Sequence, residues 1–113
     1  MTPRSLEALD RVLEQGGEPD DILRSVVRVL TEDPAIEWAG IAFLEEGDVN
    51  LGPSAGRADE SRRTRVPIMY GSTQVGELWI DGEADRGLIE RIAVLVSPYV
   101  LIGWDTRGEP WEP

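Results

Sequence analysis

The segment WAGIAFLEEGDVNLG, from Trp38 to Gly52, constrains the fold most, because it has the pattern of a β-hairpin. We predict a first strand from Glu37 to Leu44, an acidic turn around Gly47 and a short second strand from Val49 to Leu51. A hairpin alone is at most marginally stable in water, so this segment must pair with further strands or pack against helices.

The first strand alternates large and small side chains. Successive side chains of a strand point to opposite faces, so its residues fall into two sets. Ala39, Ile41 and Phe43 share one face, and Trp38, Gly40 and Ala42 share the other. The all-apolar set belongs under helices. The small residues beside Trp38 are predicted to leave space on the open face, as the floor of a binding site or of an interface.

A second hairpin follows, with strands predicted from Thr64 to Tyr70 and from Gln74 to Asp81. Pro67 cannot donate a hydrogen bond to a sheet, so the third strand should lie at an edge or carry a bulge. The segment between the hairpins, Gly52 to Arg63, is polar and rich in small residues. We predict that it forms a loop or one short helical turn.

Helical patterns flank the hairpins. A first helix is expected with Ser5 as its N-cap and an end at Gly16, and a second from Pro19 to Asp33. A third is expected from Asp85 to Trp104, kinked or split by Pro98. This order predicts an α+β, two-layer domain, an antiparallel sheet of four to five strands with helices on one face. We expect one domain over residues 1–104 and a flexible tail over residues 105–113.

The composition removes many function classes. The chain has 22 acidic and 11 basic residues, a net charge of −11, so it should repel nucleic acid. It has no Cys and no His, which excludes disulfides, thiol nucleophiles, Ser-His-Asp triads and zinc on Cys or His ligands. The N-terminal residues do not resemble a signal peptide, and the apolar stretch from Ile92 to Trp104 is too short to span a bilayer. These features predict a cytoplasmic protein without membrane contact.

Three segments together carry a resemblance to a known family. They are WAGIAFL followed by an acidic turn and LGP, then VPI before a turn, then VGELWID before the last helix. Their order over residues 5 to 104 resembles a GAF domain, a small sensory fold of signalling proteins. Among GAF domains, the segments resemble the free methionine-R-sulfoxide reductases. The matching residues are Trp38, Gly40, Leu51, Gly52, Pro53, Gly56, Gly76, Leu78, Ile80 and Asp81.

That resemblance implies a ligand site but argues against the reaction. In the reductase branch, acidic residues of the third segment hold the ammonium group of the substrate, and cysteines react. Here Asp81 matches, Trp79 stands where the family has its first acidic residue, and no cysteine exists. A thiol-dependent reaction therefore has no nucleophile. The connection between the hairpins is also short for a GAF domain, which implies a shallow or open site.

The open face of the sheet supplies the candidate site residues. Trp38 and Trp79 could stack on a flat ligand, or only pack over the sheet. Glu77 and Asp81 could bind an ammonium group or, with help, a divalent cation, or be solvated acids. The predicted ligand-binding residues are Trp38, Gly40, Ala42, Arg63, Arg65, Glu77, Trp79 and Asp81; no catalytic or metal-binding residue is predicted, and no cofactor is identified.

Four arginines form a basic cluster in this acidic chain, namely Arg57, Arg62, Arg63 and Arg65. Their guanidinium groups could clamp a carboxylate or phosphate of a small ligand or partner. Alternatively, they protect an edge strand or pair with the nearby Asp59 and Glu60.

The predicted function is a non-catalytic sensory or regulatory module that binds a small ligand or a protein on the open sheet face. A homodimer through the N- and C-terminal helices is expected, with Val94, Tyr99 and Ile102 as an apolar stripe. The alternatives are a thicker intramolecular core at that stripe, and a purely structural interaction domain of roadblock or profilin type. Domains of that type have a full helix between the hairpins.

Overall fold

The computed structural model describes residues 3–103 of the chain, and the side chains of residues 7–101. The elements in chain order are α1 (Pro3–Gln15), α2 (Pro19–Leu30), β1 (Ile36–Glu45), β2 (Asp48–Gly56), the 3-10 helix η1 (Glu60–Arg62), β3 (Arg63–Tyr70), β4 (Thr73–Gly82) and α3 (Arg86–Gly103). The predicted order of two helices, two hairpins and a helix is confirmed. The predicted tail, residues 105–113, lies outside the described residues.

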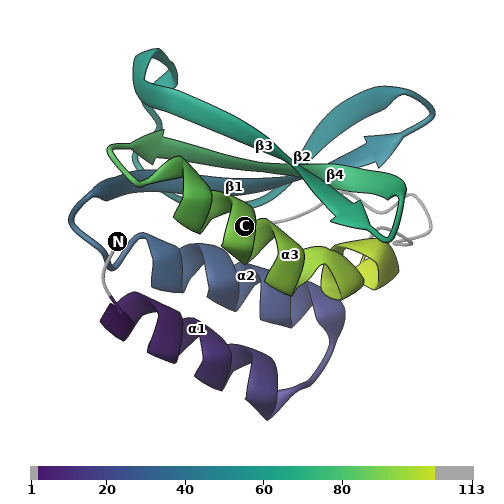
Figure 1. Ribbon diagram of the computed structural model, residues 1–113, viewed down its shortest axis with the longest axis horizontal. Coiled ribbons are helices and arrows are strands. Elements are labelled where there is room, and N and C mark those ends of the chain that lie inside the picture. The colour runs from purple at the N-terminus through teal and green to yellow at the C-terminus, as the bar shows by residue number, and fades with distance from the viewer. Residues whose placement is uncertain (1–2, 104–113) are drawn as a thin grey trace.

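The four strands form one antiparallel sheet in the order β2-β1-β4-β3. The two hairpins therefore join through β1 and β4, which lie in the centre. All three helices lie on the same side of this sheet (Figure 1). There α2 and α3 contact the strands, and α1 packs on α2. This architecture confirms the α+β prediction, and no helix or strand within residues 3–103 covers the second face of the sheet.

The core lies between the sheet and the helices α2 and α3. Ile41 and Phe43 of β1 point into it, as do Leu78 and Ile80 of β4, which confirms the predicted apolar face. Burying each such side chain contributes roughly 1.5–3 kcal/mol relative to leaving it exposed. The helices and β3 contribute further large buried residues, Leu9, Ile22, Leu23, Val26, Val27, Leu30, Val66, Ile68, Ile89, Ile92, Val96 and Val100.

The helix ends follow local chemistry, with one correction. Helix α1 begins at Pro3 and not after a cap at Ser5. Proline suits the first helical position, because its missing N–H would have no partner there and its φ is already helical. The predicted stop is confirmed, since Gly16 and Gly17 have φ angles of +69° and +118°. Such angles are unfavourable for any residue with a Cβ atom.

The second strand is longer than predicted, and the loop after it is shorter. β2 extends to Gly56, whereas the sequence predicted a strand only from Val49 to Leu51. The register explains the difference, because Gly40 pairs with Ser54 while Ala42 pairs with Leu51. This bulge, on a strand at the sheet edge, accommodates Pro53, which cannot donate to a ladder. A Gly-Pro-Ser run of this kind is predicted from the sequence to be a loop.

The connection between the hairpins holds no full helix. After β2 the chain makes only the three-residue turn η1 before β3 begins at Arg63. Asp59 caps this turn, since its carboxylate accepts a hydrogen bond from the Ser61 amide at 3.2 Å. The position of β3 at a sheet edge confirms the interpretation of Pro67.

Helix α3 is continuous through Pro98, so the proline does not split it. Proline lacks the N–H that would bond to the carbonyl of Val94. The Ser97 hydroxyl donates to that carbonyl instead, at 2.8 Å. At the other end, the Asp85 carboxylate caps the helix by accepting from the Leu88 amide at 3.1 Å. Within residues 3–103, no helix is long and apolar enough to cross a membrane.

The close packing of β1 against β4 predicts a steric effect of Gly76→Ala. An added Cβ would collide with the backbone carbonyl of Ala42 and lie 3.2 Å from Val100. Because a backbone atom obstructs it, the strands must move, and we expect a loss of roughly 1–3 kcal/mol in the free energy of unfolding. Urea unfolding measures this loss. Gly87→Ala, in the first turn of α3, is the control: its Cβ would meet only the end of the Asp85 side chain, at 3.2 Å, so the loss should be smaller. Equal unfolding midpoints for the two variants would contradict the steric argument.

Candidate functional site

The register of the sheet brings the predicted residues of three strands together on the open face. Trp38 of β1 pairs with Asp81 of β4, which in turn pairs with Arg63 of β3. One step further along, Trp79 pairs with Gly40 on one side and with Arg65 on the other. We call Trp38, Arg63, Arg65, Trp79 and Asp81 the arginine–tryptophan cluster.

A bidentate ion pair lies at the centre of the arginine–tryptophan cluster. Arg63 Nε donates to Asp81 Oδ1 at 2.7 Å, and a terminal nitrogen of Arg63 donates to Oδ2 at 3.0 Å. The Asp59 amide donates to Oδ2 as well, at 2.6 Å. Asp81 is 0% exposed, and the Arg63 side chain is 10% exposed. Charge-assisted bidentate pairs of this kind are among the strongest hydrogen bonds in proteins.

Two tryptophan rings contact the Arg63 guanidinium on adjacent sides. Its central carbon lies 4.5 Å from the ring centroid of Trp38 and 5.2 Å from that of Trp79. The two ring centroids are 6.4 Å apart with planes tilted by 41°. Arg65 lies over Trp79 as well, at 4.2 Å from the centroid. Guanidinium groups at these distances are attracted to the electron-rich ring faces.

The space predicted above Gly40 is taken up by the chain itself. A Cβ atom added at Gly40 would collide with the Trp38 ring and would lie 3.0 Å from Leu51. The Trp38 indole therefore lies along its own strand, over the residue that has no side chain. Ala42 is fully buried as well. The small residues of β1 thus make room for a tryptophan of the same strand, which is only 6% exposed.

The two acids of β4 have separate partners. Glu77 Oε1 accepts a hydrogen bond from the Trp79 indole N–H at 2.9 Å, whereas Asp81 is bound by Arg63. The geometry does not join them into one acidic site. Among the described residues, no group of three or more acidic side chains could hold a metal ion.

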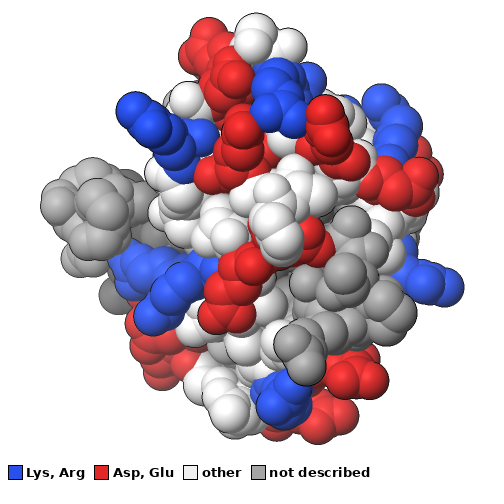
Figure 2. All heavy atoms as spheres, turned by 90° about the vertical axis from the view of Figure 1, so that its left-hand side faces the viewer, with Lys and Arg blue, Asp and Glu red and all other residues white. Residues whose placement is uncertain are grey.

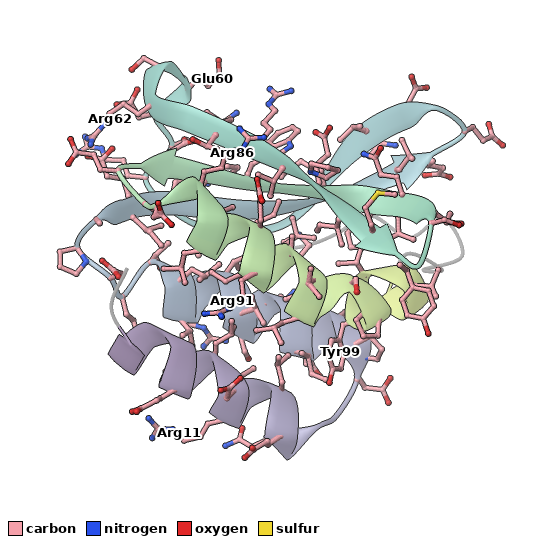
Figure 3. All side chains as sticks on the ribbon, viewed as in Figure 1. Arg11, Glu60, Arg62, Arg86, Arg91 and Tyr99 are labelled. Carbon is pink, nitrogen blue, oxygen red and sulfur yellow. The ribbon has the colours of Figure 1, made fainter. Side chains whose placement is uncertain are left out.

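The predicted basic cluster divides into arginines with different surroundings. Arg62 pairs with Glu37 at 2.7 Å and with Glu83 at 3.2 Å, at the end of the sheet where Figure 3 labels it. Figure 2 looks onto this end, and its basic side chains lie among acidic ones without a continuous basic area. Arg63 forms its close ion pair with Asp81 and a longer one, of 3.8 Å, with Glu60. Arg65 makes no ion pair with any residue that the structure describes.

An open hollow lies beside the arginine–tryptophan cluster. It has a volume of about 380 Å³ and is lined by Glu37, Arg57, Ala58 and Asp59. Of these, only Arg57 belonged to the sequence-predicted basic cluster. Asp59 also links the hollow to the cluster through its amide bond to Asp81. The Asp-Glu-Ser order of residues 59–61 is typical of a capped turn, but no sequence signal connects it to a residue 22 positions away.

The ion pair shifts the ionisation of both partners. Burial alone would raise the pKa of Asp81, but the hydrogen bonds from Arg63 and the Asp59 amide, together with the Arg63 charge, outweigh it. The pKa of Asp81 is therefore lowered. The hydrogen bond and charge of Asp81 in turn raise the pKa of Arg63, against the effect of burial. Both side chains are held in their charged forms.

Comparison with known proteins identifies the fold. The sequence matches no protein-family model, and no curated protein matches it significantly. Solved structures do match. The GAF domain of an Acinetobacter phosphoenolpyruvate-protein phosphotransferase superposes with a TM-score of 0.65 and 14% identity, over 88% of this chain and 94% of that one.

Two reductase structures match at a similar level. For the fRMsr of Staphylococcus aureus in complex with substrate, the TM-score is 0.61 and the identity 18%, over 86% of this chain and 90% of that one. For the type II free methionine-R-sulfoxide reductase of Thermoplasma acidophilum, the values are 0.59 and 19%, over 73% and 94%. The chain thus has the GAF fold, as its three sequence segments indicated.

The buried ion pair predicts a large effect of Arg63→Ala. Removing the guanidinium leaves the Asp81 carboxylate buried without its countercharge, and we expect a loss of about 3 kcal/mol in the free energy of unfolding. Arg62→Ala is a matched control from the adjacent position. Its ion pairs are at the surface, so the expected loss is about 1 kcal/mol or less. Urea unfolding compares the two, and equal losses would contradict a special role for Arg63.

The lowered pKa of Asp81 predicts a pH dependence. A carboxyl group with a depressed folded-state pKa stabilises the protein above its unfolded pKa, about 3.9, and loses this contribution as the pH falls through the folded value. The stability advantage of the wild type over Asp81→Asn should be constant near neutral pH and shrink below about pH 4. Urea unfolding between about pH 7 and pH 3 measures it. A constant difference over this range would contradict the charged pair.

Proposed function

We propose that this chain is a non-catalytic regulatory module with the GAF fold, which binds a small ligand or a protein partner on its open sheet face. The arginine–tryptophan cluster carries this proposal. Buried ion pairs contribute little net stability compared with apolar packing, so packing alone gives no reason for Asp81 and Arg63 to lie there. No helix or strand among residues 3–103 covers this face (Figure 1).

The residues present support binding over catalysis. The reductases of similar fold are enzymes by name, but a chain without cysteine has no thiolate to react with a sulfoxide. A general acid or base works best with a pKa near the operating pH. Asp81 has the opposite property, because Arg63 lowers its pKa and holds it charged. The purified protein should therefore not turn over free methionine sulfoxide, and turnover would overturn the proposal.

The exposed part of the open face indicates where a partner would bind. Arg65 is exposed and has no countercharge among the described residues, while its guanidinium is held in place over Trp79. The hollow lined by Glu37, Arg57, Ala58 and Asp59 adjoins the Asp81 end of the cluster, and its volume falls within the range of small-molecule sites. An oriented arginine suits a carboxylate or phosphate of the partner.

Binding on this face can be tested with a variant that should not affect the fold. We expect anionic metabolites that raise the melting temperature of the wild type to lose this effect in Arg65→Glu, because the charge reversal repels them. A thermal-shift screen of carboxylates and phosphates measures it. Val94→Asp, on α3 and away from the open face, is the control and should respond like the wild type. A screen without hits, or hits that Arg65→Glu retains, would contradict the proposed site.

We further propose that the module forms a homodimer through α1 and α3. Val94 is 68% exposed and Leu101 is 38% exposed, and their spacing of seven residues places them on one side of α3. Tyr99 is half-buried and packs against the core (Figure 3). The side chain of Ile102 lies outside the described residues. Exposed apolar side chains of one helix face are typical of contacts between copies.

The dimer has a direct test in the same two variants. A charge at Val94 would be buried in the proposed interface, so Val94→Asp should shift the sedimentation equilibrium toward the monomer. Arg65→Glu, on the opposite side of the sheet, should sediment like the wild type. A wild-type monomer at concentrations of about 100 µM would rule out a dimer with the affinity of a stable interface.

A further inference from the structure

We propose that Asp81, Trp38 and Trp79 form a cage for a guanidinium cation, and that Arg63 occupies this cage as a ligand tethered to β3. The inference goes beyond the proposed function, because it concerns the interior of the arginine–tryptophan cluster and not its exposed rim. The open face would then have a second kind of site, which selects a cation and is occupied by Arg63 of the same chain.

The floor of the cage is built to receive two parallel hydrogen bonds. Arg63 contacts both oxygens of the Asp81 carboxylate, at 2.7 and 3.0 Å. The carboxylate cannot turn freely, because the Asp59 amide holds Oδ2 at 2.6 Å. Asp81 is wholly inaccessible to solvent with Arg63 in place. This fixed pair of acceptors matches the planar fork of a guanidinium and suits a single ammonium less well.

The walls of the cage favour the same cation. The guanidinium carbon lies 4.5 Å and 5.2 Å from the two ring centroids, which are 6.4 Å apart, so the two indoles form adjacent walls of the site. Guanidinium groups are flat and weakly hydrated, so they stack on indoles at a lower desolvation cost than ammonium ions. The hydrogen bond from the Trp79 indole to Glu77 at 2.9 Å holds one wall in position. The other wall, Trp38, is held by its packing over Gly40.

Because Arg63 is covalently attached to the chain, it keeps the cage occupied in the wild type. Arg63 enters from the residue directly opposite Asp81 in the β3–β4 register, so no loop has to close around it. A tethered group acts at an effective concentration in the millimolar range or above. Free cations at micromolar levels therefore cannot displace it. The neighbouring Arg62 forms ion pairs with Glu37 and Glu83. These hold the start of β3 in place and so further restrain the position of Arg63.

The test removes the tethered ligand and supplies a free one. Arg63→Ala should leave an empty cage with an uncompensated carboxylate, and methylguanidinium chloride should refill it. We expect a saturable rise in the melting temperature of Arg63→Ala, on the order of 5 °C at millimolar concentrations, at constant ionic strength. The wild type should show no rise. Methylammonium should act more weakly than methylguanidinium, and neutral urea should not stabilise at all.

Controls separate refilling of the cage from general salt effects. Arg62→Ala loses an arginine at the adjacent position but no enclosed site, so methylguanidinium should not stabilise it. The double variant Arg63→Ala/Asp81→Asn lacks the floor and should not respond either. If Arg63→Ala is unfolded alone, methylguanidinium should restore its near-ultraviolet circular dichroism, whereas methylammonium should not.

The outcomes of the methylguanidinium test are distinct from those of the anion screen at Arg65. An absent response in Arg63→Ala, or an equal response in either control, would overturn the cage. Neither result would bear on anion binding at Arg65, because that screen uses the chain with Arg63 in place.

Discussion

The carboxylate of Asp81 is the constraint on which the open face of this protein depends. It accepts hydrogen bonds from two segments that are distant in sequence, the guanidinium of Arg63 on β3 and the amide of Asp59 before η1. A buried carboxylate without such partners would cost several kcal/mol. The connection from β2 to β3 therefore passes next to β4 at Asp59. It contains the three-residue turn η1 and no full helix.

The two faces of the sheet solve the same problem of burial by different means. One face is covered by α2 and α3 and filled with aliphatic side chains, as in most two-layer domains. Within residues 3–103 the other face has no second layer, and there the Trp38 ring covers Gly40 of β1 and contacts Arg63. The edge of this cover is polar and exposed at Arg65, and its centre at Arg63 and Asp81 is buried. We propose that a partner binds this face at Arg65 and in the hollow next to Asp59.

The similarity to GAF structures holds at the level of the fold, with identities of 14–19%. Folds are maintained by apolar periodicity, turns and strand edges, which many sequences can supply, whereas function depends on particular side chains at a site. Here the site contains arginine, tryptophan and aspartate in place of cysteine chemistry. The same scaffold thus supports a proposal of recognition, because Arg63 and Asp81 are held in their ionised forms while Arg65 has no countercharge among the described residues.

The order of the elements, the two faces of β1 and β4 and the helix stop at Gly16 could be predicted from the sequence alone, as could an edge or bulge position for Pro67. Each of these follows from local periodicity or from the backbone limits of glycine and proline, which act over a few residues. Three features became visible only in the folded protein: β2 continues through Pro53, Trp38 fills the space above Gly40, and Arg63 pairs with Asp81 and not only with its neighbours. These outcomes depend on the register between strands and on side-chain packing; the Arg63–Asp81 pair, for example, joins residues 18 positions apart. No local pattern in a single chain encodes that choice of partner.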